Sequence, residues 1–543
     1  MKNLKSIRTL IFAFTFLSIY TCSEDVLVES PPHIISPNTL YQDLTGFEAG
    51  INGLYAQWAR ERSGVNYGDP NDIMIDPSVV GTDNCYGNRR AGWSADVGNR
   101  FFNNTSLNSF SRKFFNWLYE IINASNTIIG ATKTEAGQAL PEADRNRITA
   151  EARLFRAWAY RHLTYSFGDV PLALETGNQG SALRDDWTRQ SVAEVRNQML
   201  EDLLFAEEYL PETSPTQGRL VKGVATHYLA ELYLELDPQQ AVVKANSLIS
   251  SGLYSLITQR YGVKANQPGT PFTDMFLDGN SNKGEGNNEA LWVMQNEALT
   301  IGGDYNMMRR WYRGRSQDVK VDGISGTIIF SEENGGRGLG RNAPTRYAME
   351  LYEDGDHRGG RFAWRTYEVL NNPNKVPPFR QLGDTIFFQW QNQDEVIKNP
   401  YWPSTRKWDY ADPNDISGTT NYNDQVYLRL AETYLVLAEA QLLTGDPQGA
   451  ANSLNTVRQR SNASLITAAD VDIDFILDER SRELWSEEHR RYSLIRAGKW
   501  YERVSQFNKV GGPTATESRD ELLPIPQSVI DVNTVSFPQN PGY

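Results

Sequence analysis

The sequence is poor in histidine and cysteine, and this shortage narrows the chemistry available to the chain. Its 543 residues include five histidines, no two close enough for a local metal motif such as His-Glu-x-x-His. Gly-x-Ser-x-Gly and dinucleotide-binding patterns are absent, and Gly335 to Gly340 lacks the spacing of a phosphate loop. We therefore expect no catalytic centre, no cofactor and no metal site.

The sequence also lacks an excess of positive charge. Its 53 lysines and arginines stand against 67 aspartates and glutamates, which gives a net charge of −14. A nucleic-acid-binding protein needs a basic face, so a nucleic-acid partner is not expected. Hydrophobic residues make up 40% of the chain and aromatic residues 11%, enough to bury a sizeable core.

Residues 1–21 have the pattern of a signal peptide. Three basic residues precede the apolar run 10–20, which at about 1.5 Å per residue is too short to cross a hydrocarbon layer of about 30 Å. The run ends at Ile19-Tyr20-Thr21-Cys22, which resembles a bacterial lipoprotein cleavage box, although Gly, Ala or Ser is commoner at the place of Thr21. Lipidation would anchor the body, residues 22–543, through Cys22, whereas an ordinary secreted protein would carry this cysteine incidentally. Cys85 would then be the only free thiol.

Helical and irregular segments divide the rest of the chain. Apolar residues recur at three- and four-residue spacings in segments such as 43–62, 110–131 and 141–167, a pattern typical of amphipathic helices. The middle is rich in glycine and contains short alternating runs such as 290–294 and 386–390, which favour turns and short strands. We expect a mainly α fold with helical repeats at about 40–254 and 424–510, a loop-rich, short-stranded insertion at about 255–423, and a C-terminal strap at 511–543.

An internal repeat supports the helical assignment. Leu229-Ala230-Glu231 leads into Asp237-Pro238-Gln239-Gln240-Ala241, and Leu437-Ala438-Glu439 leads into Asp446-Pro447-Gln448-Gly449-Ala450. In both copies a helix meets a proline turn and a second helix follows. This is the helix-turn-helix unit of tetratricopeptide-like solenoids, although the full 34-residue consensus is not matched. Such units stack and usually present a binding surface.

Six stretches of the chain resemble the SusD/RagB family. They are EARLFRAWAYRHLTYSFGDVPL (Glu151 to Leu172), LYEDGDHR (Leu351 to Arg358), VYLRLAETYLVLAEAQL (Val426 to Leu442), LNTVRQR (Leu454 to Arg460), ILDERSRELWSEEHRRYSLIRAGKW (Ile476 to Trp500) and LLPIPQSVIDVNTVSFPQNPGY (Leu522 to Tyr543). The resemblance implies a lipid-anchored lipoprotein of the outer membrane, facing the cell surface. It would capture oligosaccharides and pass them to a SusC-like TonB-dependent transporter without cleaving them.

Two alternatives to this function stay open. A RagB-type lipoprotein would capture oligopeptides and would need a cleft for an extended backbone. A surface glycoside hydrolase would need two carboxylates about 5 to 9 Å apart across a cleft, and no motif supports one. The charged residues 479–483 are spaced to form ion pairs along one helix face, which favours a structural role for them.

The ligand site is expected among aromatic and polar loop residues, because sugars stack their CH faces on aromatic rings. The family places this site in the loop after the first helix and in the middle insertion, where residues 83–93 and 309–312 fall. The aromatic candidates are Trp93, Trp311 and Tyr312. The polar candidates are Asp83, Arg89, Arg90 and Asn99. The alternative for each ring is that it packs its own loop.

Two further patterns bear on the ligand. Four arginines lie within residues 309–315, and guanidinium groups suit carboxylates and sulfates. A uronic-acid glycan, a sulfated glycan or a peptide carboxylate is one interpretation, and pairing with Asp304 and Asp318 is the other. Residues 278–289 match four positions of a calcium loop, but Lys283 stands where that loop needs glycine.

Overall fold

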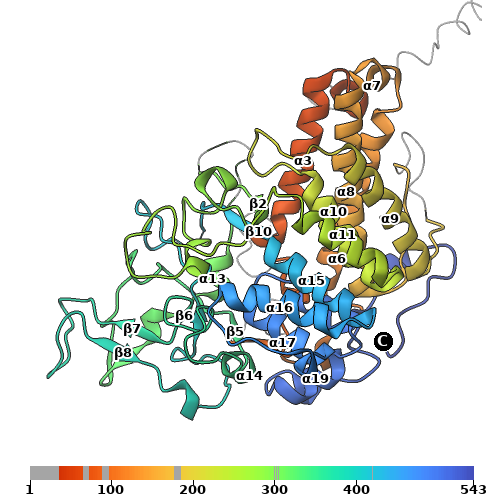
Figure 1. The fold of residues 1–543 in the computed structure, drawn as a ribbon. Helices are drawn as coiled ribbons and strands as arrows, with labels where there is room; N and C mark the ends of the chain where they lie inside the picture. The colour runs from red at the N-terminus through yellow and green to blue at the C-terminus, as the bar shows by residue number, and fades with distance from the viewer. Residues whose placement is uncertain are drawn as a thin grey trace, which may run out of the picture.

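The computed structural model describes residues 36–64, 73–88, 97–176, 185–298, 300, 303, 305–418 and 420–543. Cys22, Arg89, Arg90 and Trp93 lie outside these residues. The described chain is mainly α-helical, as predicted, with the helices gathered on one side and short strands on the other (Figure 1). No helix among the described residues is long and apolar enough to cross a membrane.

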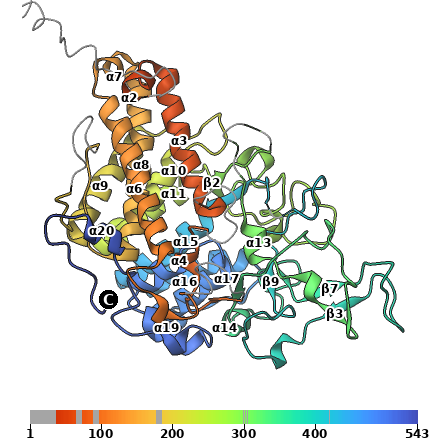
Figure 2. The ribbon, with the colours of Figure 1, turned by 180° about the vertical axis from the view of Figure 1, so that it is seen from behind.

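Four long helices form the N-terminal helical layer: α3 (Leu44–Ser63), α6 (Ser109–Ala131), α8 (Glu142–Phe167) and α9 (Val192–Tyr209) (Figures 1 and 2). Their apolar stripes are buried, as the spacing predicts; Phe47, Ile51 and Leu54 of α3 are fully covered. Helix α8 ends at Gly168, whose φ of +70° suits glycine. Pro171 follows shortly after, so the predicted helix end is confirmed.

The two copies of the sequence repeat form two helical hairpins. The first joins α10 (Lys222–Leu236) to α11 (Pro238–Ile249), and the second joins α15 (Leu430–Leu443) to α16 (Pro447–Arg460). Each second helix begins with a proline, and Asp237 or Asp446 caps its N-terminus. The hairpins pack together through a buried cluster rich in alanine, which includes Ala230 and Ala440.

The C-terminal helices are α17 (Ile473–Leu484), α18 (Arg490–Arg496) and α19 (Trp500–Phe507). The residues after them run back along the helical layer toward the end of α8 (Figure 2). There the Leu523 amide donates to the Ser166 carbonyl (2.6 Å), and the Asn540 side chain donates to the Phe167 carbonyl (3.0 Å). These backbone contacts hold the last residues of the chain against α8.

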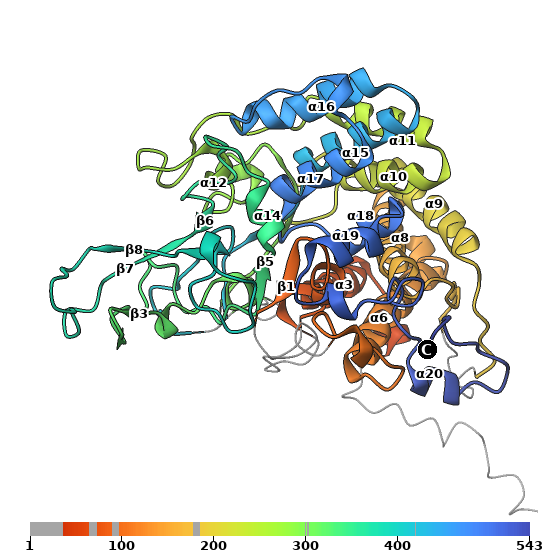
Figure 3. The same ribbon diagram turned by 90° about the horizontal axis from the view of Figure 1, so that it is seen from below.

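The middle of the chain is built from short two-stranded antiparallel ladders. The pairs are β2 (Ala290–Met294) with β10 (Gln425–Arg429), β1 (Cys85–Gly87) with β5 (Asn342–Pro344), β3 (Lys320–Val321) with β4 (Ile324–Ser325), β6 (Trp364–Arg365) with β9 (Ser404–Thr405), and β7 (Tyr367–Val369) with β8 (Thr385–Phe387). The predicted strand at 290–294 is confirmed, whereas Trp390 begins a 3-10 turn after β8. The β7–β8 hairpin projects away from the helices (Figure 3).

Short helices connect these parts. They are α2 (Pro37–Leu40), α4 (Asp76–Val79), α7 (Glu135–Ala139), α12 (Pro271–Asp274), α13 (Met308–Tyr312), α14 (Arg346–Glu350) and α20 (Gln527–Asp531). A single large core joins the helical side to the irregular side. In it the Trp58 ring of α3 stacks on the Trp292 ring of β2, with centroids 3.9 Å apart and planes 3° from parallel.

Candidate functional site

The two aromatic candidates of α13 are buried. Trp311 and Tyr312 have no exposed surface. The Trp311 indole donates to Asp76 Oδ2 at 2.8 Å, and the Arg341 guanidinium lies 4.2 Å from the ring centroid. In this structure β5 and the loop before it cover α13, so neither ring is presented at the surface. Their ligand role stays a prediction.

The polar candidates Asp83 and Asn99 belong to the scaffold. Asp83 is fully buried and binds Arg490 (2.7 Å) and Arg503 (2.8 Å). Burial alone would raise the pKa of Asp83, but these two guanidiniums outweigh it and hold that pKa below its usual value. The Asn99 side chain bonds both backbone groups of Gly87. Both side chains are thus engaged by the scaffold in this structure, and their ligand role stays a prediction.

Tryptophan burial limits where an aromatic surface can lie. Of the thirteen tryptophans in the sequence, Trp93 alone lies outside the described residues. Eleven others are buried, including Trp402 and Trp408 in loops, and Trp187 is partly buried. A stacking surface built from tryptophan would therefore have to use Trp93, the partly buried Trp187 or a displaced loop. Trp93, Arg89 and Arg90 remain predictions.

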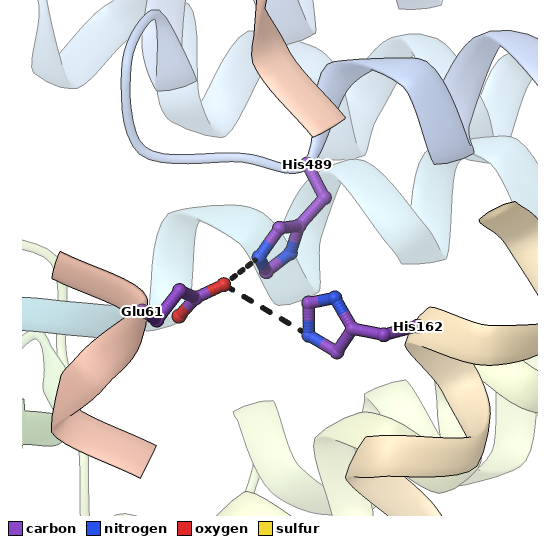
Figure 4. A group of neighbouring side chains, drawn as sticks. All are labelled: Glu61, His162 and His489. Carbon is purple, nitrogen blue, oxygen red and sulfur yellow. Dashed lines mark hydrogen bonds and ion pairs between the residues drawn. The ribbon is translucent and has the colours of Figure 1, made fainter. Parts of the chain in front are cut away.

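A buried group of Glu61, His162 and His489 joins α3, α8 and the start of α18 (Figure 4). Glu61 Oε1 lies 2.7 Å from His489 Nε2 and 3.9 Å from His162 Nε2. The second ring nitrogen of His162 meets the Tyr492 hydroxyl at 2.8 Å. The members of this group are far apart in the chain, so no local sequence pattern reveals them.

The geometry of this group fits a hydrogen-bond network better than a metal centre. Two ligand atoms of a tetrahedral zinc ion lie about 3.3 Å apart, which is wider than the 2.7 Å between Glu61 and His489. Arg161 lies 3.1 Å from His489 Nδ1, and because guanidinium only donates, that nitrogen is an acceptor. The proton of neutral His489 is then on Nε2 and is donated to Glu61.

Glu483 of α17 is the centre of a buried ion network. Its carboxylate binds Arg358 (3.1 Å) and makes still shorter contacts with Arg429 and Arg460. Burial alone would raise the pKa of Glu483, but these guanidiniums lower it far below its usual range. Glu479 also binds Arg358 (2.7 Å). Pairing along the helix face occurs as predicted, but most partners of the two carboxylates come from other elements.

Side chains of residues 278–289, the segment that resembles a calcium loop, bind other parts of the protein. Asn280 Oδ1 accepts from the Val263 amide (2.8 Å), and the Asn282 amide group donates to Asp424 (2.7 Å). Glu289 binds Arg429 (2.9 Å) and Arg460 (3.0 Å). This segment is a structural turn before β2.

The arginines around α13 fall into two kinds. Arg313 binds Glu368 (2.6 Å), and Arg315 binds Asp318 (3.1 Å) as predicted. Arg309 and Arg310 have no carboxylate within 4.0 Å in the part of the chain that the structure describes. Arg337, which was not among the candidates predicted from the sequence, joins them. Its signal was the glycine-rich context Gly335 to Gly340.

Two family models match separate parts of the chain. The model described as "SusD family" matches residues 389–543, and the model described as "Starch-binding associating with outer membrane" matches residues 83–234. SusD-like protein P2 of Formosa agariphila is 25% identical over 552 residues, which cover 98% of this chain and 99% of that protein. The similarity therefore extends over the whole length of both.

Solved structures share the fold. A SusD superfamily protein from Bacteroides vulgatus superposes with a TM-score of 0.70 at 19% identity, covering 93% of this chain and 100% of the other. A structure described as a laminarin-binding SusD-like protein superposes with a TM-score of 0.69 at 21% identity, with 93% and 100% covered. The two family models and the full-length relative together identify the chain as a member of the SusD-like family.

Proposed function

We propose that this protein is a glycan-binding lipoprotein of the outer membrane that captures oligosaccharides at the cell surface. The observation that carries the proposal is similarity along the entire chain to a SusD-like protein, with 98% of this chain aligned. One structural neighbour is described as laminarin-binding, and one matching family model as starch-binding and associated with the outer membrane.

The proposal includes a lipid anchor and a partner. Cys22, behind its apolar leader, would carry the lipid and hold the body at the outer membrane, facing outward. The captured oligosaccharide would pass to a SusC-like TonB-dependent transporter. The stacked hairpins α10–α11 and α15–α16 offer a helical surface of the kind that repeat proteins use for partners.

We further propose that the protein does not cleave its ligand. A glycosidase needs a general acid with a raised pKa beside a second carboxylate. The acidic residues gathered around α17 have the opposite character, since Glu479, Glu483 and Glu487 are buried and bound by basic side chains that lower their pKa. We infer that these carboxylates stabilise the fold and do not bind a substrate.

Within this function, the loop residues Arg89, Arg90 and Trp93 remain the proposed ligand contacts. Trp93 would stack on a sugar ring, and the two arginines would bind hydroxyl or acidic groups. They stand in the loop that follows β1, whose strand is fixed against β5. Binding residues commonly lie on loops that a rigid scaffold positions.

Isothermal titration calorimetry on the chain begun at Ser23 tests the proposal. The panel would contain neutral oligosaccharides, acidic oligosaccharides and peptides. We expect saturable binding of an oligosaccharide that weakens at least tenfold in Trp93→Ala. The matched control is Phe102→Ala, which truncates a different aromatic ring that is 60% exposed. Binding of peptides alone would favour the RagB-type alternative, and release of reducing ends would favour the hydrolase.

A further inference from the structure

Three arginines gather where α13 meets the loop of residues 335–340. Arg309 and Arg310 lie on α13, and Arg337 lies in the loop. The backbones of the two segments are paired, since the Leu339 amide donates to the Arg310 carbonyl at 3.0 Å. The Gly340 amide donates to the carbonyl of Arg313, the residue that follows α13, at 2.8 Å. The three side chains are therefore held at one place by regular backbone contacts.

Glycines allow the loop to approach the arginines closely. Gly336 has a φ of +68°, and a Cβ atom there would lie 2.5 Å from Arg309 Nη1. A Cβ atom at Gly338 would lie 2.2 Å from the Arg313 carbonyl oxygen. Larger residues would push the loop off α13. The glycine-rich stretch is thus a close-packed backbone that brings Arg337 to the helix.

The guanidiniums of this group have few protein partners. Arg309 donates to the carbonyls of Tyr410 and Gly418, and Arg337 donates to the carbonyl of Ser417 at 3.3 Å. The Arg310 side chain makes no hydrogen bond to any residue that the structure describes. The Nε–H groups of all three are buried and have no acceptor among those residues.

No carboxylate lies within 4.0 Å of these three arginines in the described ranges, although the protein is acidic overall. Burial lowers the pKa of Arg309 to about 10, even though the more distant Asp409 and Asp415 oppose the shift. Burial and the neighbouring Arg337 lower the pKa of Arg310. Arginine is normally charged at any physiological pH, so a lowered pKa here reflects a guanidinium whose burial is not fully offset by neighbouring acids.

We propose that Arg309, Arg310 and Arg337 form a binding site for the acidic group of an anionic glycan. The acidic group is a uronic-acid carboxylate or a sulfate ester, because guanidinium forks bind both through paired N–H donors. Arg310 and Arg337 are half-buried, so they can reach a ligand from the surface, while the buried Arg309 adds charge behind them. This inference rests on the proposed function and specifies its substrate class.

Position and incomplete pairing both support a ligand role. Arg309 and Arg310 lie on α13, and Arg310 and Arg337 are both partly exposed, so the group opens to the surface. A buried charge without a partner is unfavourable for the fold, so pairing among the described residues does not account for these arginines. Asp304, the other acid considered as an internal partner, lies outside the described residues, so a variant must test it.

The test is calorimetry on the full mature body with three probes: oligogalacturonate for carboxylate, a sulfated galactan oligosaccharide for sulfate, and laminari-oligosaccharides as the neutral probe. The double variant R310Q/R337Q removes both half-buried guanidiniums. The matched control is R315Q, which removes a neighbouring arginine that already has Asp318 as its partner.

We expect one acidic probe to bind and the double variant to weaken it by roughly ten- to a hundredfold, the usual effect of losing charged hydrogen bonds. Raising the salt concentration should weaken wild-type binding and have less effect on the variant. R315Q should change the affinity less than twofold. Which acidic probe binds decides between carboxylate and sulfate.

Other outcomes would overturn the inference. Equal binding of neutral and acidic probes, unchanged in R310Q/R337Q, would reject the anionic site and leave the proposed function standing. Failure of every oligosaccharide, or binding of peptides alone, would reject the proposed function and this inference with it. A tenfold gain of acidic-probe affinity in Asp304→Asn would show that an internal acid already occupies the guanidiniums.

Discussion

Two groups of arginines in this protein differ in what surrounds them. Around α17, Arg358, Arg429 and Arg460 converge on Glu483, and each lies within 3.1 Å of its carboxylate. Around α13, Arg309 and Arg310 have no carboxylate partner within 4.0 Å among the described residues. Both groups are rich in positive charge, but within the part of the chain that the structure describes only the first contains its own negative charge.

The difference separates two uses of the same side chain. A buried charge that is paired and hydrogen-bonded holds elements together, and removing one partner leaves the others exposed to a large desolvation cost. A guanidinium without an acid keeps its donors available for a ligand. We therefore expect substitutions in the first group to act on stability and substitutions in the second to act on binding.

The largest effect is expected for Glu483→Gln. The amide keeps the shape of the carboxylate but leaves three buried guanidiniums without their shared negative charge. We expect the free energy of unfolding to fall by about 3 to 5 kcal/mol, measured by urea denaturation. The control is Glu517→Gln, an exposed carboxylate for which a change within about 0.5 kcal/mol is expected. Equal effects in the two variants would remove the distinction between the groups.

Trp311→Phe tests whether the Trp311 ring of α13 belongs to the ligand-binding surface or to the hydrophobic core. The substitution removes the indole donor and leaves Asp76 Oδ2 without it. We expect a loss of about 1 to 3 kcal/mol in the free energy of unfolding. The affinity for any bound oligosaccharide should stay within twofold of wild type. A large loss of affinity at unchanged stability would restore the stacking role predicted from the sequence.

A smaller effect is expected for His162, which should make the free energy of unfolding depend on pH. Burial, together with His489 and Arg161, lowers the pKa of His162 well below its usual value of 6.5. The folded state then binds fewer protons than the unfolded state below pH 6.5, so this histidine makes folding less favourable as the pH falls. Its contribution is at most about 1.4 kcal/mol per pH unit.

His162→Gln should remove this contribution. Urea denaturation at pH 7.5, 6.5 and 5.5 would then show a shallower decrease of the unfolding free energy for the variant than for wild type. Parallel decreases in the two proteins would mean that His162 does not titrate across the folding transition.

The smallest effect is expected for Arg315→Gln. Arg315 and Asp318 form a partly exposed pair, with side-chain exposures of 32% and 35%. Such pairs contribute about 0 to 1 kcal/mol, because water screens them. A loss above about 2 kcal/mol by urea denaturation would show that pairing near α13 matters as much as pairing around α17, and the comparison would fail.

Helix positions and buried helix faces could be predicted from the sequence, because they depend on local periodicity. Trp58, Trp117 and Trp158 lie in the predicted amphipathic segments 43–62, 110–131 and 141–167, and all three are buried. Partners distant in sequence could not be predicted. Arg358 and Glu483 are 125 residues apart, and no local pattern tells which charges will meet.

The site could be predicted less well, because a loop's own sequence does not say what will cover it. Polar neighbours favoured exposure of Trp311, yet Asp76 and Arg341 come from other segments and enclose it. Asp83 stood in a polar loop and is bound by arginines more than 400 residues away. The arginines of α13 were noticed, but Arg337 joins them only through the fold.

The central claim is tested most directly by measuring two quantities on R310Q/R337Q: the free energy of unfolding and the Kd for an acidic oligosaccharide. We predict that the free energy of unfolding stays within about 0.5 kcal/mol of wild type, while the Kd rises at least tenfold. A fall of several kcal/mol in the free energy of unfolding with an unchanged Kd would contradict the account. These arginines would then stabilise the fold and would not bind a ligand.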